Sequence, residues 1–258
     1  MSTNNIYLLK QLSRRDLAHR YKGTVGGILW VVIQPLFMLA IYTVVFGMIF
    51  KPRWNGLDSV WDYALVIFLG KIPYIFMLET VGRSPGLISS HVSYVKKLAF
   101  PLQLLPWMSH LTAAIVAGIS LLVWLVFFIG IHHSFPVGIF LIPVIYLPMF
   151  ISLLGVSYML SSLGAYFKDV GNFVQPILFA MMFMSPVFYP LDMVPERIKS
   201  LMLLNPLVYP IEQSRGLLLF SGTFDFASYL FQLATAALVL LVGWLWFERT
   251  REGFAEVL

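Results

Sequence analysis

The sequence contains no cysteine and few charged residues. Without cysteine the chain can form no disulfide bond, no thiol nucleophile and no thiolate metal site. Charged residues make up only 11% of its 258 residues, whereas a soluble domain carries about 25%. Hydrophobic residues make up 59%, and the mean hydropathy is +0.84. This small number of charges cannot cover a surface that faces water. The composition therefore predicts an integral membrane protein.

Residues that would hydrolyse ATP or relay protons are also scarce. A phosphate-binding loop needs the pattern GxxxxGK[ST]. The only Gly-Lys pair, Gly70–Lys71, has Leu65 in place of the first glycine and Ile72 in place of the Ser or Thr. Glu79 is the only clear carboxylate candidate for a proton relay within the apolar segments,. The chain is therefore expected to have no ATPase site and no cofactor of its own, and uphill transport would draw its energy from another subunit.

Six apolar segments are each long enough to cross the roughly 30 Å hydrocarbon core of a bilayer as a helix. They cover residues 28–50, 61–80, 104–131, 137–167, 173–189 and 227–247. The apolar runs are continuous rather than alternating, which favours helices over the strands of a membrane barrel. The polar and basic residues before the first run contain no short apolar core of a cleavable signal peptide. The predicted fold is an all-α integral membrane protein with six transmembrane helices.

Lysine and arginine residues are divided unequally between the two sides that these spans define. Eleven fall on the side of both termini, five fall on the other side, and Lys71 lies within a span. Because cytoplasmic loops carry the excess of Lys and Arg, both termini are predicted to be cytoplasmic. Topology then explains the net charge of +5, and the sequence does not predict nucleic-acid binding.

The N-terminal residues change abruptly from basic to apolar. Residues 1–22 predict an interfacial helix, which either anchors on anionic lipid headgroups or docks on a cytoplasmic partner. Glycines at positions 23, 26 and 27 permit a sharp change of direction at little steric cost. We expect a bend between this helix and the first span.

Two other segments outside the spans are unusual. The cytoplasmic loop at residues 82–106 contains prolines that frame a short helical candidate, residues 87–99. The outer segment at residues 185–226 contains two apolar pieces, 200–204 and 217–220, that are too short to cross a membrane. They predict interfacial or re-entrant helices, which occur at membrane depth only when protein buries them or a cavity adjoins them.

Five blocks, taken in order, resemble the permeases of ABC-2 type transporters, in particular the branch that exports lipid-linked polysaccharides. They are RRDLAHRYKGTVGG (14–27), SYVKKLAFPLQLLP (93–106), YFKDVGNFVQPIL (166–178), SPVFYPLDMVP (185–195) and NPLVYPIEQSRGLLL (205–219). The resemblance covers the whole chain, and the ordered set is far more specific than any single block.

The resemblance implies one transmembrane domain over residues 1–258. Residues 1–27 would hold the cytoplasmic interface helix, residues 28–247 the six-span region and residues 248–258 a cytoplasmic tail. The loop between spans two and three would hold a coupling helix, and re-entrant helices would lie between spans five and six. The family assembles as a homodimer with two separate ATPase subunits, which bind ATP and Mg²⁺. The implied cargo is an undecaprenyl-linked polysaccharide (an O antigen, a capsule or a teichoic acid), exported across the bacterial cytoplasmic (inner) membrane.

The same resemblance assigns roles to particular residues. Contacts with the ATPase are expected from Arg14, Arg15, Asp16, Arg20, Tyr94, Lys96 and Lys97. A pore at the dimer seam would be lined by spans one and five, with aromatic candidates Phe37, Tyr42, Phe46, Phe173, Phe179, Phe183 and Tyr189. Aromatic rings suit sugar passage because they stack on C–H faces without strong directional bonds. The alternative for each ring is a lipid-facing or core position.

Two basic residues have more than one interpretation. Lys71 departs from the family pattern, because the family has an uncharged residue at this point of span two. It lies about 15 Å into the span from Trp61, at 1.5 Å per residue, and an isolated lysine there costs about 2.5 to 3.5 kcal/mol. Lys71 either snorkels or faces a helix interface, or it contacts anionic or hydroxyl-rich cargo in the pore. Arg215 is either an anion contact at the exit or a structural partner of Glu212.

Two other functions remain open. An ABC-2 permease that moves a drug or a lipid would share the fold. An intramembrane transferase would need clustered carboxylates or a His–Asp pair facing a cavity, and the predicted spans show neither.

Overall fold

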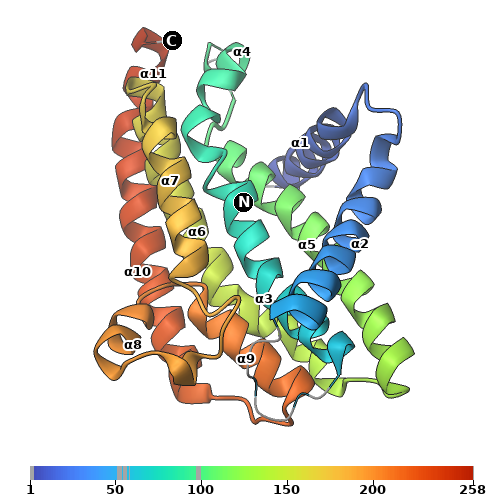
Figure 1. Ribbon diagram of the computed structural model, residues 1–258. Helices are drawn as coiled ribbons and strands as arrows, with labels where there is room; N and C mark the ends of the chain where they lie inside the picture. The colour runs from blue at the N-terminus through green and yellow to red at the C-terminus, as the bar shows by residue number, and fades with distance from the viewer. Residues whose placement is uncertain (1–2, 51–53, 55–56, 58, 97–99, 258) are drawn as a thin grey trace.

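The computed structural model describes residues 3–50, 54, 57, 59–96 and 100–257, and all regular elements among them are helical (Figure 1). The longer helices are α1 (Thr3–Tyr21), α2 (Trp30–Tyr42), α3 (Val60–Thr80), α5 (Leu104–His132), α6 (Ile142–Tyr166), α7 (Val170–Phe183), α9 (Val208–Leu219) and α10 (Phe226–Thr250). The short ones are α4 (Val92–Val95), α8 (Glu196–Met202) and α11 (Phe254–Val257). A π-helix, η2 (Thr43–Phe50), continues α2, and single 3-10 turns such as η3 (Ser84–Gly86) lie in the connections.

Four of the six predicted spans are confirmed as helices long and apolar enough to cross a membrane. They are Val60–Gly86, Leu104–His132, Val137–Tyr166 and Phe226–Val257. The apolar helices at the first and fifth predicted spans, Trp30–Phe46 and Val170–Phe183, are shorter. The prediction for the fifth span ran to residue 189, whereas α7 ends at Phe183. Pro186 follows closely, and proline has no N–H with which to continue a helix.

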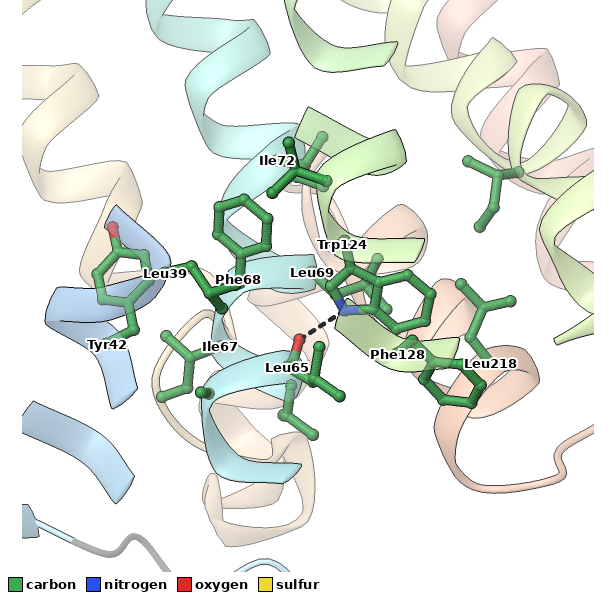
Figure 2. Packing of buried hydrophobic residues seen from close by; sticks show 14 of the residues in the cluster. Leu39, Tyr42, Leu65, Ile67, Phe68, Leu69, Ile72, Trp124, Phe128 and Leu218 are labelled. Carbon is green, nitrogen blue, oxygen red and sulfur yellow. Dashed lines mark hydrogen bonds between the residues drawn. The ribbon is translucent and has the colours of Figure 1, made fainter. Parts of the chain in front are cut away.

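Helix α3 lies at the centre of the bundle. In the most apolar stretch of α3, 78% of the residues are buried. In the corresponding stretches of α5 and α10, only 17% of the residues are buried. A helix that is apolar on all sides belongs in a core. In Figure 2, Leu65 and Leu69 of α3 lie near Trp124 and Phe128 of α5, and the Trp124 indole N–H donates to the Leu65 carbonyl at 3.0 Å. These contacts hold α3 against α5.

Helices α6 and α10 pack backbone against backbone. A Cβ atom placed on Gly243 would lie 2.1 Å from the Gly155 carbonyl oxygen. A Cβ on Gly155 would lie 2.5 Å from the Val239 carbonyl oxygen. Small residues permit this close approach between membrane helices, so these two glycines make α6 and α10 one rigid pair.

The predicted bend before the first span is confirmed. Helix α1 ends at Tyr21, and the glycines that follow adopt left-handed backbone angles, with φ +85° at Gly23 and +49° at Gly27. Non-glycine residues rarely adopt such angles. Figure 1 shows the chain reversing between α1 and α2, with α1, α4 and α11 toward one end of the molecule and α8 and α9 at the opposite end.

The connections between spans differ in detail from the sequence prediction. In the 87–99 segment the structure shows a 3-10 turn, Ser89–His91, followed by α4, and residues 97–99 lie outside the described part. The apolar pieces 200–204 and 217–220 are the C-terminal parts of α8 and α9 and their flanks, so each helix begins earlier than predicted. Residues 137–141 form a 3-10 helix before α6.

Candidate functional site

Charged residues at the end of the bundle that is predicted to face the cytoplasm join α1 to α3. The Asp16 carboxylate of α1 accepts hydrogen bonds from Arg83 Nη2 at 2.9 Å and Arg83 Nη1 at 3.2 Å, just beyond the C-terminus of α3. Arg20, one turn further along α1, donates to Asp16 at 3.1 Å and to Glu79 of α3 at 2.5 Å. We call Asp16, Arg20, Glu79 and Arg83 the inner ionic cluster, after the predicted orientation. It links two helices that are distant in sequence.

The Asp16 carboxylate is the best-shielded member of this cluster, with 9% of its side chain exposed. Burial by itself raises the pKa of this carboxyl,. The hydrogen bond and charge of Arg83, together with the charge of Arg20, outweigh burial and hold the pKa of Asp16 below its ordinary value. Asp16 is therefore ionised at neutral pH and stabilises the contact between the two helices.

Apolar contacts fix the other side of α1. Leu9 and Leu12 are buried in a cluster with Leu104, Leu105 and Met108 of α5. The opposite side of α1 is exposed and mixes apolar and basic side chains: Ile6, Tyr7, Lys10, Gln11, Arg14, Arg15 and His19. We call this set the α1 outer face. Its orientation follows from the buried leucines.

A second link joins α1 to α4. Arg15 donates a hydrogen bond to the Tyr94 hydroxyl, and its guanidinium carbon lies 5.5 Å from the centroid of the Tyr94 ring. The Tyr94 ring stacks on Phe100 with a centroid distance of 4.3 Å. Residues 79 positions apart therefore meet beside the inner ionic cluster.

The residues predicted to contact an ATPase divide into three groups. Arg15, Asp16, Arg20 and Tyr94 lie in the linked region of α1, α3 and α4. Arg14 and Lys96 are exposed nearby, and Lys97 lies outside the described residues. Sequence reasoning missed Arg83 as a member of this region and considered Glu79 only as a proton-relay candidate. Their position at the inner end of a long apolar run was the available signal.

A cavity of about 370 Å³ lies among α2, α3, α5 and α7. Three of the predicted pore residues line it, namely Tyr42, Lys71 and Phe179. Phe37, Phe173 and Phe183 lie on the surface with 62%, 72% and 54% exposure. Phe46 stacks on Phe188 at 5.1 Å, and the Tyr189 hydroxyl donates to the Phe183 carbonyl at 2.7 Å. The predicted pore residues thus fall partly in a cavity and partly on exposed helix faces.

Lys71 faces this cavity and α7. Its Nζ atom lies 2.7 Å from the Met182 sulfur, 4.2 Å from the centroid of the Tyr74 ring and 5.5 Å from that of Phe188. The side chain combines features of two interpretations, because it touches a helix interface and also borders open space.

Arg215 of α9 lies in a shell of backbone carbonyls and is only 2% exposed. It donates to Val66 O at 3.0 Å, to Val187 O at 2.6 Å and to Pro186 O, and Glu212 lies 3.7 Å away. The guanidinium fits only because α3 has glycine at position 70, where a Cβ would lie 2.2 Å from Nη2. Arg215 therefore ties α9 both to α3 and to the segment that follows α7.

Comparison with known proteins shows the family of this chain. The sequence profile of ABC-2 type transporters matches residues 7–219. The chain belongs to the ABC-2 type transporter family. It is 30% identical over 256 residues to a Myxococcus xanthus protein named O-antigen export system permease protein RfbA, covering 96% of this chain and 94% of that protein. A Klebsiella pneumoniae protein of the same name is 25% identical, with 97% and 95% covered.

A third relative has a different named cargo. The polysialic acid transport protein KpsM of Escherichia coli is 25% identical over 248 residues, which cover 95% of this chain and 93% of that protein. Membership of the family identifies this chain as a membrane permease component of an ABC transporter. The four long apolar helices agree with a multi-pass membrane protein.

Two features bear on an enzymatic role for this chain, and the second corrects the sequence analysis. First, residues 82–86 read GRSPG and match the GxSxG nucleophile pattern,. Ser84 is completely buried, however, and its hydroxyl donates to the Thr80 carbonyl at 2.8 Å, so it caps the end of α3. Second, a His–Asp pair does border a cavity. His132 Nε2 lies 3.1 Å from Asp62 Oδ1, and both line a cavity of about 320 Å³ at the outer ends of α3 and α5.

The His132–Asp62 pair lacks the third member of a hydrolytic site. Nucleophilic catalysis needs a hydroxyl or thiol within hydrogen-bond reach of the histidine. Ser134 and Ser221 line the same cavity, but in the part of the chain that the structure describes neither hydroxyl is hydrogen-bonded to His132, whose ring packs on Phe128 at 4.5 Å. The pair joins the outer ends of two helices.

Proposed function

We propose that this chain is the permease subunit of an ABC exporter that moves a lipid-linked polysaccharide across the bacterial cytoplasmic membrane. The observation that carries the proposal is the link from the α1 outer face, through the inner ionic cluster, to the central helix α3. Such a link suits a helix on which an external ATPase acts. The full-length similarity to proteins named for O-antigen and polysialic acid transport supports polysaccharide as the cargo class.

The ATPase would dock on the α1 outer face and on the segment around α4. Arg14, Arg15, Lys96 and Lys97 would supply positive charge there. Movement of α1 would pass to α3 because Asp16 holds Arg83 while Arg20 holds Glu79. The partner subunit would bind ATP and Mg²⁺, and this chain would contribute no cofactor. Both termini would be cytoplasmic.

Two copies of the chain would enclose the conduit. The helices at the first and fifth predicted spans, α2 with η2 and α7, would complete a six-span domain and face the second copy. Their exposed aromatic residues Phe37, Phe173 and Phe183 would line or border the passage. Aromatic faces contact sugar C–H groups without holding them through directional hydrogen bonds. Arg215 is assigned a structural role at the outer end, because three carbonyls surround it.

A genetic experiment tests this function. Cells that lack the gene for this chain should accumulate lipid-linked glycan in the cytoplasm and lose surface polysaccharide. Re-expression of the chain should clear the accumulated glycan and restore surface polysaccharide. It should do neither when the phosphate-binding loop of the partner ATPase is inactivated. An exporter of a drug or an ordinary lipid would leave glycan distribution unchanged. Solute accumulation by the purified chain alone in liposomes would contradict the proposal.

A further inference from the structure

The cation of Lys71 lacks a counter-charge. Its Nζ contacts are the Met182 sulfur and the faces of Tyr74 and Phe188. A thioether is a weak hydrogen-bond acceptor, and an aromatic face gives a cation only modest attraction. Among the described residues, no carboxylate lies within ion-pair distance of Lys71. An ionisable residue in the membrane without a partner is by default a functional site.

The carboxylate that shares the cavity does not compensate Lys71. Glu79 also lines this space, but Arg20 of the inner ionic cluster binds it at 2.5 Å. The two residues lie eight positions apart on α3, which corresponds to about 12 Å along a helix axis. The cavity therefore holds one uncompensated cation, with its one negative charge already neutralised at the inner end.

The shape and lining of the cavity indicate the ligand class. Its volume of about 370 Å³ lies within the range of roughly 300 to 1,000 Å³ found for ligand sites. Tyr42, Tyr74 and Ser120 place hydroxyl groups around it, and apolar side chains such as Phe68, Ile75 and Leu78 supply much of the wall. Phosphate oxygens would match the ammonium and hydroxyl groups, and a hydrocarbon chain would match the apolar wall. A hydrated acidic sugar would leave hydroxyl groups against apolar side chains.

We propose that this cavity binds the diphosphate end of the lipid-linked cargo, with Lys71 as its cationic contact. The inference rests on the proposed function, because it names the part of the cargo that this chain recognises. A phosphate oxygen accepts a hydrogen bond from Lys71 Nζ, which then exchanges the weak Met182 contact for a charge-assisted one. The first isoprenoid units lie along the apolar wall. The site spans α3 and α7, so an occupied cavity links the central helix to a seam helix.

A binding experiment tests the site without transport. The purified full-length chain is placed in nanodiscs of zwitterionic lipid, and binding of farnesyl diphosphate is measured. Farnesol and inorganic diphosphate serve as comparison probes, because each lacks half of the proposed ligand. We expect saturable binding of farnesyl diphosphate, and binding of the other two weaker by about tenfold or more.

Variants separate the charge from the fold. Lys71→Met should weaken farnesyl diphosphate binding about tenfold or more and leave farnesol binding unchanged, whereas Lys71→Arg should stay within about threefold. Tyr42→Phe and Tyr74→Phe should each weaken binding a few-fold, which tests the site even if Lys71→Met folds poorly. Lys199→Met is the matched control, because Lys199 already pairs with Glu196 and Asp192 on the outer side. The unfolding midpoint of Lys71→Met should equal or exceed that of the parent chain.

Each opposite result overturns the assignment. Equal binding by the parent chain and Lys71→Met removes Lys71 from the site. Equally tight binding of inorganic diphosphate makes the cavity a plain anion site, and tighter binding of a glucuronate oligosaccharide makes it an acidic-glycan site. Equal competition by phosphatidylglycerol makes it a site for bulk lipid. If binding is found but re-expression does not restore polysaccharide export, the proposed function fails and the site stands. If export is restored but farnesyl diphosphate does not bind, the site is rejected and the proposed function stands.

Discussion

Arg215 and Lys71 are two basic side chains that the bundle takes out of water, and their surroundings differ. Three carbonyl oxygens and Glu212 surround Arg215, which is 2% exposed. A sulfur atom and two aromatic rings surround Lys71, which borders a cavity. A buried cation costs free energy unless hydrogen bonds and opposite charges replace water. Hydrogen bonds and the charge of Glu212 offset this cost at Arg215, whereas only weak contacts offset it at Lys71.

The comparison separates a structural charge from the charge that we propose binds the ligand. Arg215 holds α9 against α3, and Gly70 exists at this point of α3 because any larger residue would occupy the guanidinium position. Lys71 is the very next residue on α3, yet its side chain turns to the α7 side. Adjacent positions on one helix point in directions about 100° apart, which follows from 3.6 residues per turn. On the same buried helix, Gly70 therefore makes room for Arg215 of α9, and the adjacent Lys71 borders the cavity.

Of the variants considered, Arg215→Met should lower the stability of the protein most. The change leaves the carbonyls of Val66, Pro186 and Val187 without their donor, and it leaves Glu212 without its partner. Losing one side of a buried polar pair costs about 3 to 5 kcal/mol, so we expect a sharply lower unfolding midpoint in nanodiscs. Gly70→Ala should act in the same direction from the α3 side. Arg197→Met, at an exposed arginine of α8, should change stability by less than about 0.5 kcal/mol.

A stable Arg215→Met protein that has lost binding of an anionic cargo would reverse the assignment. Arg215 would then belong with Lys71 as a ligand contact. The unfolding midpoint and the farnesyl diphosphate titration, measured on the same sample, distinguish the two outcomes.

Asp16→Asn extends the comparison to a buried charge that links α1 to the end of α3. The amide keeps the shape of the carboxylate but loses the charge that holds Arg83 and Arg20. We expect folding to weaken by about 1 to 2 kcal/mol. Because the α1–α3 link is loosened, export-coupled ATP turnover should fall about tenfold while membrane insertion is unchanged. Asp169→Asn, at an exposed position before α7, is the control. Normal coupling in Asp16→Asn would show that α1 transmits force through its leucine contacts.

Lys97→Glu tests a charge that the sequence resemblance assigns to the contact with the ATPase. Lys97 lies outside the described residues, so this prediction comes from the sequence resemblance. Charge reversal should lower coupled ATP turnover a few-fold and leave both stability and membrane insertion unchanged, as expected for a charge at the rim of an interface. Turnover and export at the parental level would remove Lys97 from the docking surface.

The smallest effect concerns pH. The pKa of Asp16 is lower in the folded protein than its ordinary value of 3.8. A carboxyl with a depressed pKa stabilises the folded state above its unfolded pKa, and it loses that contribution as pH falls through the folded pKa. The α1–α3 contact should therefore be constant near neutral pH and weaken in acid below about pH 4. Proteolysis at the bend between α1 and α2 can report this, and Asp16→Asn should reduce the acid dependence of that cleavage, since the Arg20–Glu79 pair remains.

Long apolar runs were recognisable in the sequence because a helix that crosses lipid needs about 20 apolar residues in succession. The same rule failed for α7, where the run continues past Phe183 but Pro186 and the contacts of Asn205 with Met184 and Ser185 end the helix. Hydropathy detects burial or lipid exposure, and it does not detect where a backbone turns. For the same reason, α8 and α9 begin well before the apolar pieces predicted at 200–204 and 217–220, and α4 covers only part of the predicted segment 87–99.

The sequence predicted those residues of the candidate site that lie together in one helix. It did not predict the residues that come into contact from different helices. Arg15, Asp16 and Arg20 follow from the basic start of the chain. Arg83 joins them from 67 positions away, and no local pattern announces this contact. The His132–Asp62 pair was overlooked because His132 ends α5 and Asp62 lies in the first turn of α3, 70 positions away in the sequence.

Composition, hydropathy and motif order were sufficient to identify a multi-pass helical membrane protein of the ABC-2 type, because these properties depend on the solvent around each segment and on residues close in the chain. Which of its charges is satisfied depended on the packed bundle. Arg215 and Lys71 are both basic residues in apolar surroundings, and only the positions of carbonyls, sulfur and rings contributed by other helices distinguish a structural tie from an open cation.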